Sequence, residues 1–210
     1  ASEGNAAPVP AVSPASEGNA APVPAVSPAS EGNPAPIVQD APVGRKGDPS
    51  KAGSIGGVAA AQVDASQMGT LSNEQFAAFD VNQAAAFTAD AVGGIKKDQL
   101  AAIDPTAMAG FGKDQVAGFA PTAVAGLGKD QVAAFDPTAM AGFDKDHLAA
   151  FDPTVMAGLG KDQVAGFDPT AMAGLGTDHF KSFDKEAMAG FGKDHLAAFD
   201  TAAMTAFDKD

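Results

Sequence analysis

Residues 135–150 contain the unit from which most of this chain is built: Phe135-Asp136-Pro137-Thr138-Ala139-Met140-Ala141-Gly142, then Phe143-Asp144-Lys145-Asp146-His147-Leu148-Ala149-Ala150. The two halves are variants of one octapeptide whose first residue is large and apolar. Steps of eight residues from Val63 to Phe207 always land on Phe, Leu, Ile or Val. A short repeat without interruption indicates a repeat architecture, in which each unit is stabilised by its neighbours.

The octapeptide matches a very short α-helix if position 2 is the N-cap. Asp, Ser or Thr there offers an oxygen to the free N–H groups of the first turn, and Pro at position 3 then occupies the first helical residue, where it loses no hydrogen bond. Positions 1 and 6 are predicted to form a hydrophobic staple, and Ser72 with Gln75 a capping box. The predicted N-caps and first-position prolines are Ser72, Thr88, Asp104, Asp136, Asp152 and Asp168, and Pro105, Pro121, Pro137, Pro153 and Pro169.

Small residues at positions 7 and 8 are expected to let successive backbones approach closely. Gly at position 8 is also expected to end each helix in the left-handed conformation. A helix this short is unstable alone, so its stability must come from stacking. We therefore predict an all-α solenoid of very short helices. A β-solenoid and an irregular fold are the alternatives, and the abundance of Ala, Gly and Met argues against strands.

From Ile95 onward two types of octapeptide alternate, which gives a 16-residue dyad. One type reads Asp-Pro-Thr-Ala-Met-Ala-Gly after the first residue, and the other Gly-Lys-Asp-Gln-Val-Ala-Gly or Ala. The simplest arrangement has two helices per structural step, with the two types on opposite sides of the solenoid. One face would then carry Lys and Asp, and the other Asp-Pro-Thr.

The N-terminal region has a different repeat, because residues 1–14 recur at 15–28 and drift at 29–42. Frequent prolines favour an extended path, either a semi-rigid spacer or an arm that contacts a neighbouring subunit. The predicted organisation is an extended arm over residues 1–50, a transition or cap over 51–62, and the solenoid over 63–210. A start at Ala1 without a leader fits a mature secreted protein, and the abrupt end suggests that the native chain continues.

Composition excludes several classes of function. The net charge of −13 and the pI of about 4.4 argue against binding to nucleic acid or an anionic membrane. There is no cysteine, so disulfides and thiolate metal sites are excluded. No apolar run approaches the roughly 20 residues that span a bilayer. No nucleophile with a base at a defined spacing and no phosphate-binding loop occurs, so we expect no enzyme, no catalytic residue and no cofactor.

Two sets of residues are candidate ion ligands. His147, His179 and His195 occupy position 5 of the Lys-Asp type, where related octapeptides carry Gln, which indicates a capping or surface polar role rather than metal binding. Asp144, Asp146, Asp208 and Asp210 are calcium candidates, although no segment matches a calcium-binding loop.

The segment Leu71-Ser72-Asn73-Glu74-Gln75-Phe76-Ala77-Ala78-Phe79 resembles the Leu-Thr-x-x-Gln-Val-x-Ala-Leu octapeptide of many secreted or surface-anchored bacterial repeat proteins. The resemblance covers residues 63–210, with Phe often replacing Leu and Asp-Pro or Gly-Lys replacing Thr-Thr. It implies an extracellular or cell-surface location. We expect a structural, self-assembling protein, a filament or surface-layer subunit whose arm contacts its neighbours in a homo-oligomer or polymer. The alternative is an extracellular adhesion module, with or without calcium dependence, that uses one solenoid face.

Overall fold

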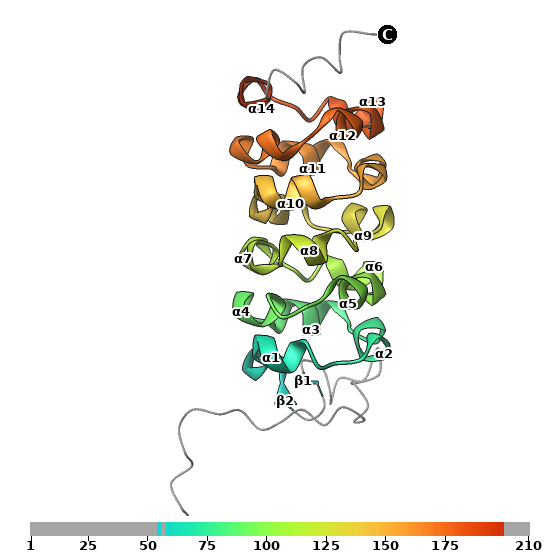
Figure 1. Ribbon diagram of the computed structural model, residues 1–210, viewed down its shortest axis with the longest axis vertical. Coiled ribbons are helices and arrows are strands. Elements are labelled where there is room, and N and C mark those ends of the chain that lie inside the picture. Colours follow the sequence, from blue (N-terminus) through green and yellow to red (C-terminus); the bar gives the residue numbers. More distant parts are fainter. Residues whose placement is uncertain (1–53, 56–57, 200–210) are drawn as a thin grey trace, which may run out of the picture. The chain divides into compact units, whose positions relative to one another are not determined.

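The computed structural model describes Ser54–Ile55 and residues 58–199, which all belong to one compact unit. The predicted arm, Asp208 and Asp210 lie outside these residues. The described chain begins with a two-stranded antiparallel hairpin of β1 (Ser54–Ile55) and β2 (Val58–Ala59), followed by the 3-10 helix η1 (Ala60–Gln62). Seventeen short helices then follow, one for each octapeptide, so the prediction of a short-helix solenoid is confirmed (Figure 1).

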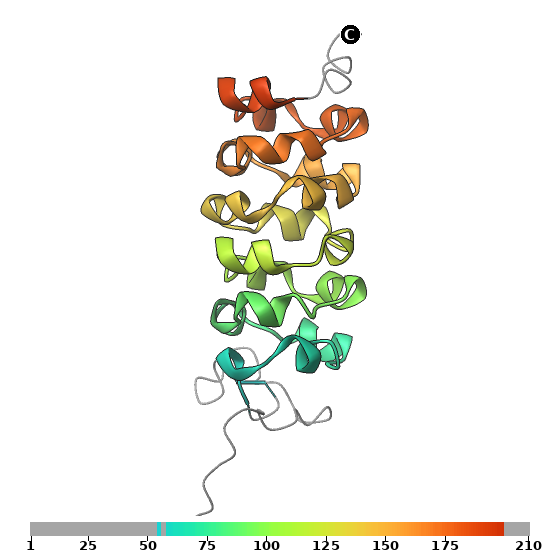
Figure 2. The ribbon, with the colours of Figure 1, turned by 60° about the vertical axis from the view of Figure 1, so that its left-hand side comes forward.

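The helices stack in three columns around a common core (Figures 1 and 2). The first column contains α1 (Ala65–Met68), α4 (Ala89–Val92), α7 (Lys113–Gly118), η2 (Pro137–Gly142), α11 (Lys161–Gly166) and α13 (Lys185–Met188). The second contains α2 (Asn73–Ala77), α5 (Lys97–Ala102), α8 (Pro121–Val124), α10 (Lys145–Ala150), η4 (Pro169–Gly174) and α14 (Lys193–Ala198). The third contains α3 (Val81–Ala86), α6 (Pro105–Met108), α9 (Lys129–Ala133), η3 (Pro153–Gly158) and α12 (Thr177–Ser182).

One turn of the solenoid therefore takes three octapeptides. Helices α4, α7 and η2 begin at Ala89, Lys113 and Pro137, each 24 residues after the one before, and each packs on its predecessor. The predicted placement of the two octapeptide types on opposite sides is wrong. Because a 16-residue alternation is laid over a 24-residue turn, from Ile95 onward the two types alternate along every column, and no face belongs to one type.

The caps explain where each helix begins. Every predicted N-cap accepts a backbone hydrogen bond through its side chain, and every predicted proline is the first residue of its helix. Three octapeptides of the Asp-Pro-Thr type form the 3-10 helices η2, η3 and η4, whereas α6, of the same type, is a short α-helix. In η2 the Ala139 N–H donates to the Asp136 carbonyl at 2.9 Å, the tighter spacing of a 3-10 turn.

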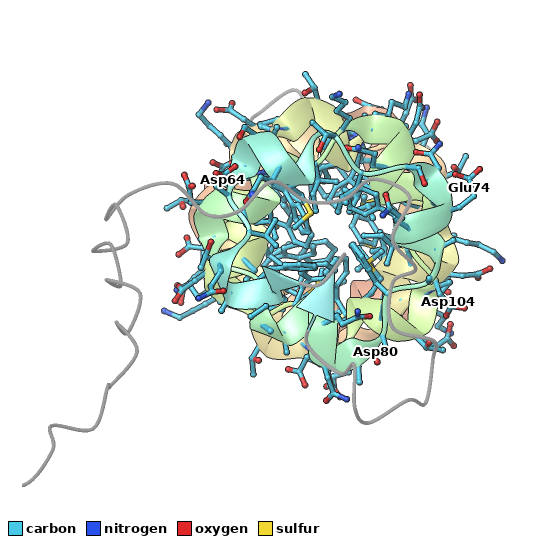
Figure 3. All side chains as sticks on the ribbon, turned by 90° about the horizontal axis from the view of Figure 1, so that it is seen from below. Asp64, Glu74, Asp80 and Asp104 are labelled. Atoms are coloured by element: carbon cyan, nitrogen blue, oxygen red, sulfur yellow. The ribbon has the colours of Figure 1, made fainter. Side chains whose placement is uncertain are left out.

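The core is formed by positions 1 and 6, as predicted. From Val63 to Leu175 position 1 is at most 4 % exposed, and Met108, Met140, Met156 and Met172 at position 6 are fully buried. Figure 3, an end-on view, shows these carbon and sulfur atoms inside the ring of helices, and the labelled acidic residues Asp64, Glu74, Asp80 and Asp104 around the outside.

Glycine at position 8 has a different role from the one predicted. None of the glycines between Gly69 and Gly192 has φ in the left-handed region. A Cβ on Gly142 would instead lie 2.3 Å from the Lys113 carbonyl oxygen in the turn below, and one on Gly174 would lie 1.9 Å from that of Lys145. These glycines are needed because two backbones approach closely. Position 7 contributes less to this approach, since Ala149 is exposed.

Candidate functional site

Position 5 of the Lys-Asp type carries a buried polar side chain that joins successive turns. The Gln115 Oε1 accepts from the Gly112 N–H at 2.7 Å, which closes a capping box within α7. Its Nε2 donates to the carbonyls of Ala84 and Phe87 in the turn below, each at 2.7 Å. One amide thus accepts from a free helix N–H and donates to two carbonyls of the turn below, of which that of Ala84 also accepts from the Phe87 N–H. We call this arrangement the position-5 clamp.

The clamp repeats through the middle of the solenoid. Gln99, Gln131 and Gln163 each accept from their own N-cap N–H, and each donates to the position-1 carbonyl that lies 28 residues earlier, at 2.7–2.9 Å. Gln131 and Gln163 also donate to a position-6 carbonyl, Leu100 and Val132 respectively, both at 2.9 Å. Among the described residues, no buried side-chain nitrogen or oxygen lacks a hydrogen-bond partner.

The three histidines make a reduced form of the same clamp. Nδ1 of His179 accepts from the Gly176 N–H at 2.9 Å, and Nε2 lies 3.0 Å from the Phe151 carbonyl. These backbone partners require the neutral tautomer with hydrogen on Nε2, because Nδ1 must be an acceptor and a carbonyl can only accept. The predicted capping role is confirmed. The alternative, a surface polar role, does not apply, since the histidines are 3–8 % exposed, and the bond to the turn below adds a role that the sequence did not indicate.

In the Asp-Pro-Thr octapeptides, each Asp carboxylate is held by hydrogen bonds from the Thr two residues later. Asp136 Oδ1 accepts from the Thr138 hydroxyl at 2.6 Å and from the Thr138 N–H at 2.8 Å, and Asp152 and Asp168 make the same pair of bonds with Thr154 and Thr170. The Thr hydroxyl, and then the Thr N–H, lowers the pKa of each of these carboxyl groups. These oxygens therefore serve as caps.

The described calcium candidates are also occupied by local contacts. Asp144 Oδ1 accepts from the N–H groups of Asp146 and His147 as the N-cap of α10, and Asp146 pairs with Lys145 at 2.6 Å. The pKa of Asp144 is lowered chiefly by the His147 N–H. Within the described ranges no three acidic or histidine side chains gather as a metal site would require.

One groove opens between α4 and α7, with a volume of about 460 Å³. Phe87, Ala89, Gly112, Lys113, Asp114 and Gln115 line it. Its buried amide, Gln115, already bonds to backbone on both sides, and the charged groups at the rim are a single Lys and a single Asp. The groove brings together no nucleophile, base or set of ligands.

No helix in the described part of the chain is both long and apolar enough to cross a membrane. Comparison of the sequence with protein-family models, with curated proteins and with solved structures finds no match.

Proposed function

We propose that this protein is a structural protein whose octapeptide solenoid serves as a stiff rod, and that it assembles with copies of itself in a filament or surface layer. The observation that carries the proposal is the use of the buried polar groups. Each clamp side chain at position 5 is engaged in joining one turn to the next, and none is left to meet a ligand.

The distribution of the octapeptide types supports the same proposal. Since the Lys-Asp and Asp-Pro-Thr types alternate along each column, acidic and basic groups are spread over all three faces. A ligand-binding solenoid normally concentrates its recognition residues on one surface. An even, acidic exterior favours a soluble, self-repelling rod, whose contacts with other copies would be made elsewhere on the chain.

The proposed contact is the Pro-rich segment over residues 1–42, which could extend on the order of 130 Å as a polyproline helix. We propose an extracellular or cell-surface location, supported by the resemblance of residues 71–79 to the octapeptides of surface proteins. No enzymatic activity is proposed.

Electron microscopy and light scattering of the purified protein, with and without residues 1–42, test the proposal. We expect filaments or sheets of the full chain and isolated rods of the truncated one. Isolated rods from both would overturn self-assembly, and undiminished assembly after truncation would overturn the role of the arm. The alternative calcium-dependent adhesion module predicts a calcium-dependent rise in Tm, whereas the occupied Asp144 and Asp146 predict no change.

A further inference from the structure

The last three described helices are joined to the turn below in a different way from the middle ones. Helix α12 uses His179, α14 uses His195, and α13 has Ala187 at position 5 and makes no clamp. In the described residues, these helices bond to the backbone of the turn below through two side chains, and both are histidines. In the middle turns that bond comes from Gln99, Gln115, Gln131 or Gln163, apart from His147 in α10.

An imidazole can gain a proton where an amide cannot, and the clamp has no place for that proton. Nδ1 of His179 faces the Gly176 N–H at 2.9 Å, and Nδ1 of His195 faces the Gly192 N–H at 3.0 Å. Protonation of Nδ1 would set two N–H groups against each other and leave the helix N–H without an acceptor. The unfolded segment has no such conflict, so acid favours the open state.

Neighbouring charges do not remove this conflict. Asp152, which also interacts with Lys97, faces His179 from the turn below, while Asp178 and Lys181 lie on the same helix as His179. Asp168, which also interacts with Lys113, faces His195 in the same way, and Lys193 and Asp194 lie on α14. The Asp152 and Asp168 carboxylates attract an imidazolium, but both are exposed and bonded to Thr, so their attraction is screened. Neither accepts the Nδ1 proton.

His147 differs in one respect that makes it an internal control. Its N-cap is Asp144, whose Oδ1 lies 2.8 Å from His147 Nδ1. A proton on that nitrogen therefore meets a carboxylate, whereas Gly176 and Gly192 provide none. Helix α10 should tolerate acid that α12 and α14 do not.

From these contacts we propose that the C-terminal end of the described solenoid is an acid-releasable turn: mild acid opens α12–α14 through His179 and His195, while the glutamine-clamped turns stay closed. In mild acid, opening of α12–α14 would expose the apolar residues that these helices bury, and closing would cover them again at neutral pH. This inference does not depend on whether the rod polymerises.

Hydrogen exchange of the full chain, measured at about pH 7.5 and about pH 5.5 and corrected for the intrinsic rate, tests the proposal. We expect protection in α12–α14 to fall about tenfold or more at the lower pH, as follows from the loss of one buried acceptor at each histidine, with α7 and α9 unchanged. The double variant His179→Gln, His195→Gln should keep its protection, because Gln fills the same position elsewhere in the chain. His147→Gln, the matched control, should respond to acid as the wild type does.

Equal loss of protection in the wild type and the double variant would overturn the proposal. Nitrogen-15 chemical shifts of the wild-type imidazoles provide a second test that needs no variant. Neutral His179 and His195 with hydrogen on Nε2 are expected at pH 7.5, and hydrogen on Nδ1 would contradict the clamp directly.

Discussion

Helices α10 and α14 compare one sequence in two settings. Residues 143–151 and 191–199 are identical except at the second position, which is Asp144 in one and Gly192 in the other. Both form six-residue helices over Lys-Asp-His-Leu-Ala-Ala. Helix α10 packs between α8 and η4, whereas the described neighbour of α14 in its column is η4 alone. Leu148 is fully buried, and Leu196 is 47 % exposed.

The difference separates what an octapeptide specifies by itself from what it obtains from its neighbours. Helix length, the bond from the N-cap N–H to the histidine Nδ1 and the bond from histidine to the turn below are found in both places, so they follow from the sequence that the two segments share. Only α10 has a side-chain cap in addition, from Asp144. The burial of the position-6 side chain differs between the two places, because in α10 the turn above covers it. A one-dimensional stack of this kind is most stable in its middle and weakest at an uncovered end.

The largest expected difference between the two helices is in the effect of truncating the leucine at position 6, Leu148→Ala in α10 and Leu196→Ala in α14. Truncation of the buried Leu148 removes contacts and leaves a cavity, and we expect a loss of about 2–5 kcal/mol of unfolding free energy. Leu196→Ala changes the same residue in the same helix, but on an open surface, and should cost less than about 1 kcal/mol. Urea denaturation followed by circular dichroism measures both. Similar losses would show that α14 is covered in solution.

The next largest effect is expected where η4 lies on α10. A Cβ on Gly174 would meet the Lys145 carbonyl oxygen at 1.9 Å, so Gly174→Ala should force the two turns apart and cost about 1–3 kcal/mol. Gly176→Ala is the matched control two residues later, because its Cβ would lie 3.6 Å from His179 Nδ1, at an ordinary contact distance. Equal melting temperatures of the two variants would contradict the close approach of the backbones.

The features that could be predicted from sequence are those confined to one octapeptide. Asp136, Pro137 and Ser72 indicate caps because their partners are two or three residues away, and the apolar residues at positions 1 and 6 indicate the core. The number of helices per turn could not be read in this way, because 16 and 24 are both multiples of eight and the helix caps are the same for either. The 16-residue dyad therefore indicated two helices per turn, whereas the folded chain has three.

The clamp was missed for a related reason. Gln115 and His179 bond to carbonyls 28 or 31 residues earlier, and that register is defined only when the turn has three helices. The regular exchange of Gln and His at position 5 was the available signal. Both side chains have one acceptor and one donor at a similar separation, and a surface role does not require that pattern.

A smaller effect should follow from exchange of the clamp itself. Gln131→His keeps the bonds to the Gly128 N–H and the Ile103 carbonyl but loses the bond to Leu100, so we expect a loss of about 1 kcal/mol at neutral pH. The middle of the solenoid should also become sensitive to acid, because Gly128 offers no carboxylate. Denaturation at neutral and mildly acidic pH measures both effects, and Lys129→Ala, an exposed change on the same helix, should alter neither.

Gly192→Asp, the smallest expected effect, removes the one difference between the two segments. An Asp N-cap in place of Gly should stabilise α14 by a few tenths of a kcal/mol at neutral pH. In mild acid the gain should grow, since the new carboxylate would lie beside His195 as Asp144 lies beside His147.

The pKa of Asp144 is lowered in the folded chain, first by the His147 N–H, so the unfolded chain takes up the proton first as pH falls. The stabilisation is therefore present above about pH 4, the ordinary range of an Asp, and is lost as pH falls further through the folded value. The gain in amide protection of α14 over the wild type, measured from neutral pH to below about pH 4, should therefore rise and then fall. A gain that did not change with pH would show that the carboxylate acts only as a cap and not on the histidine.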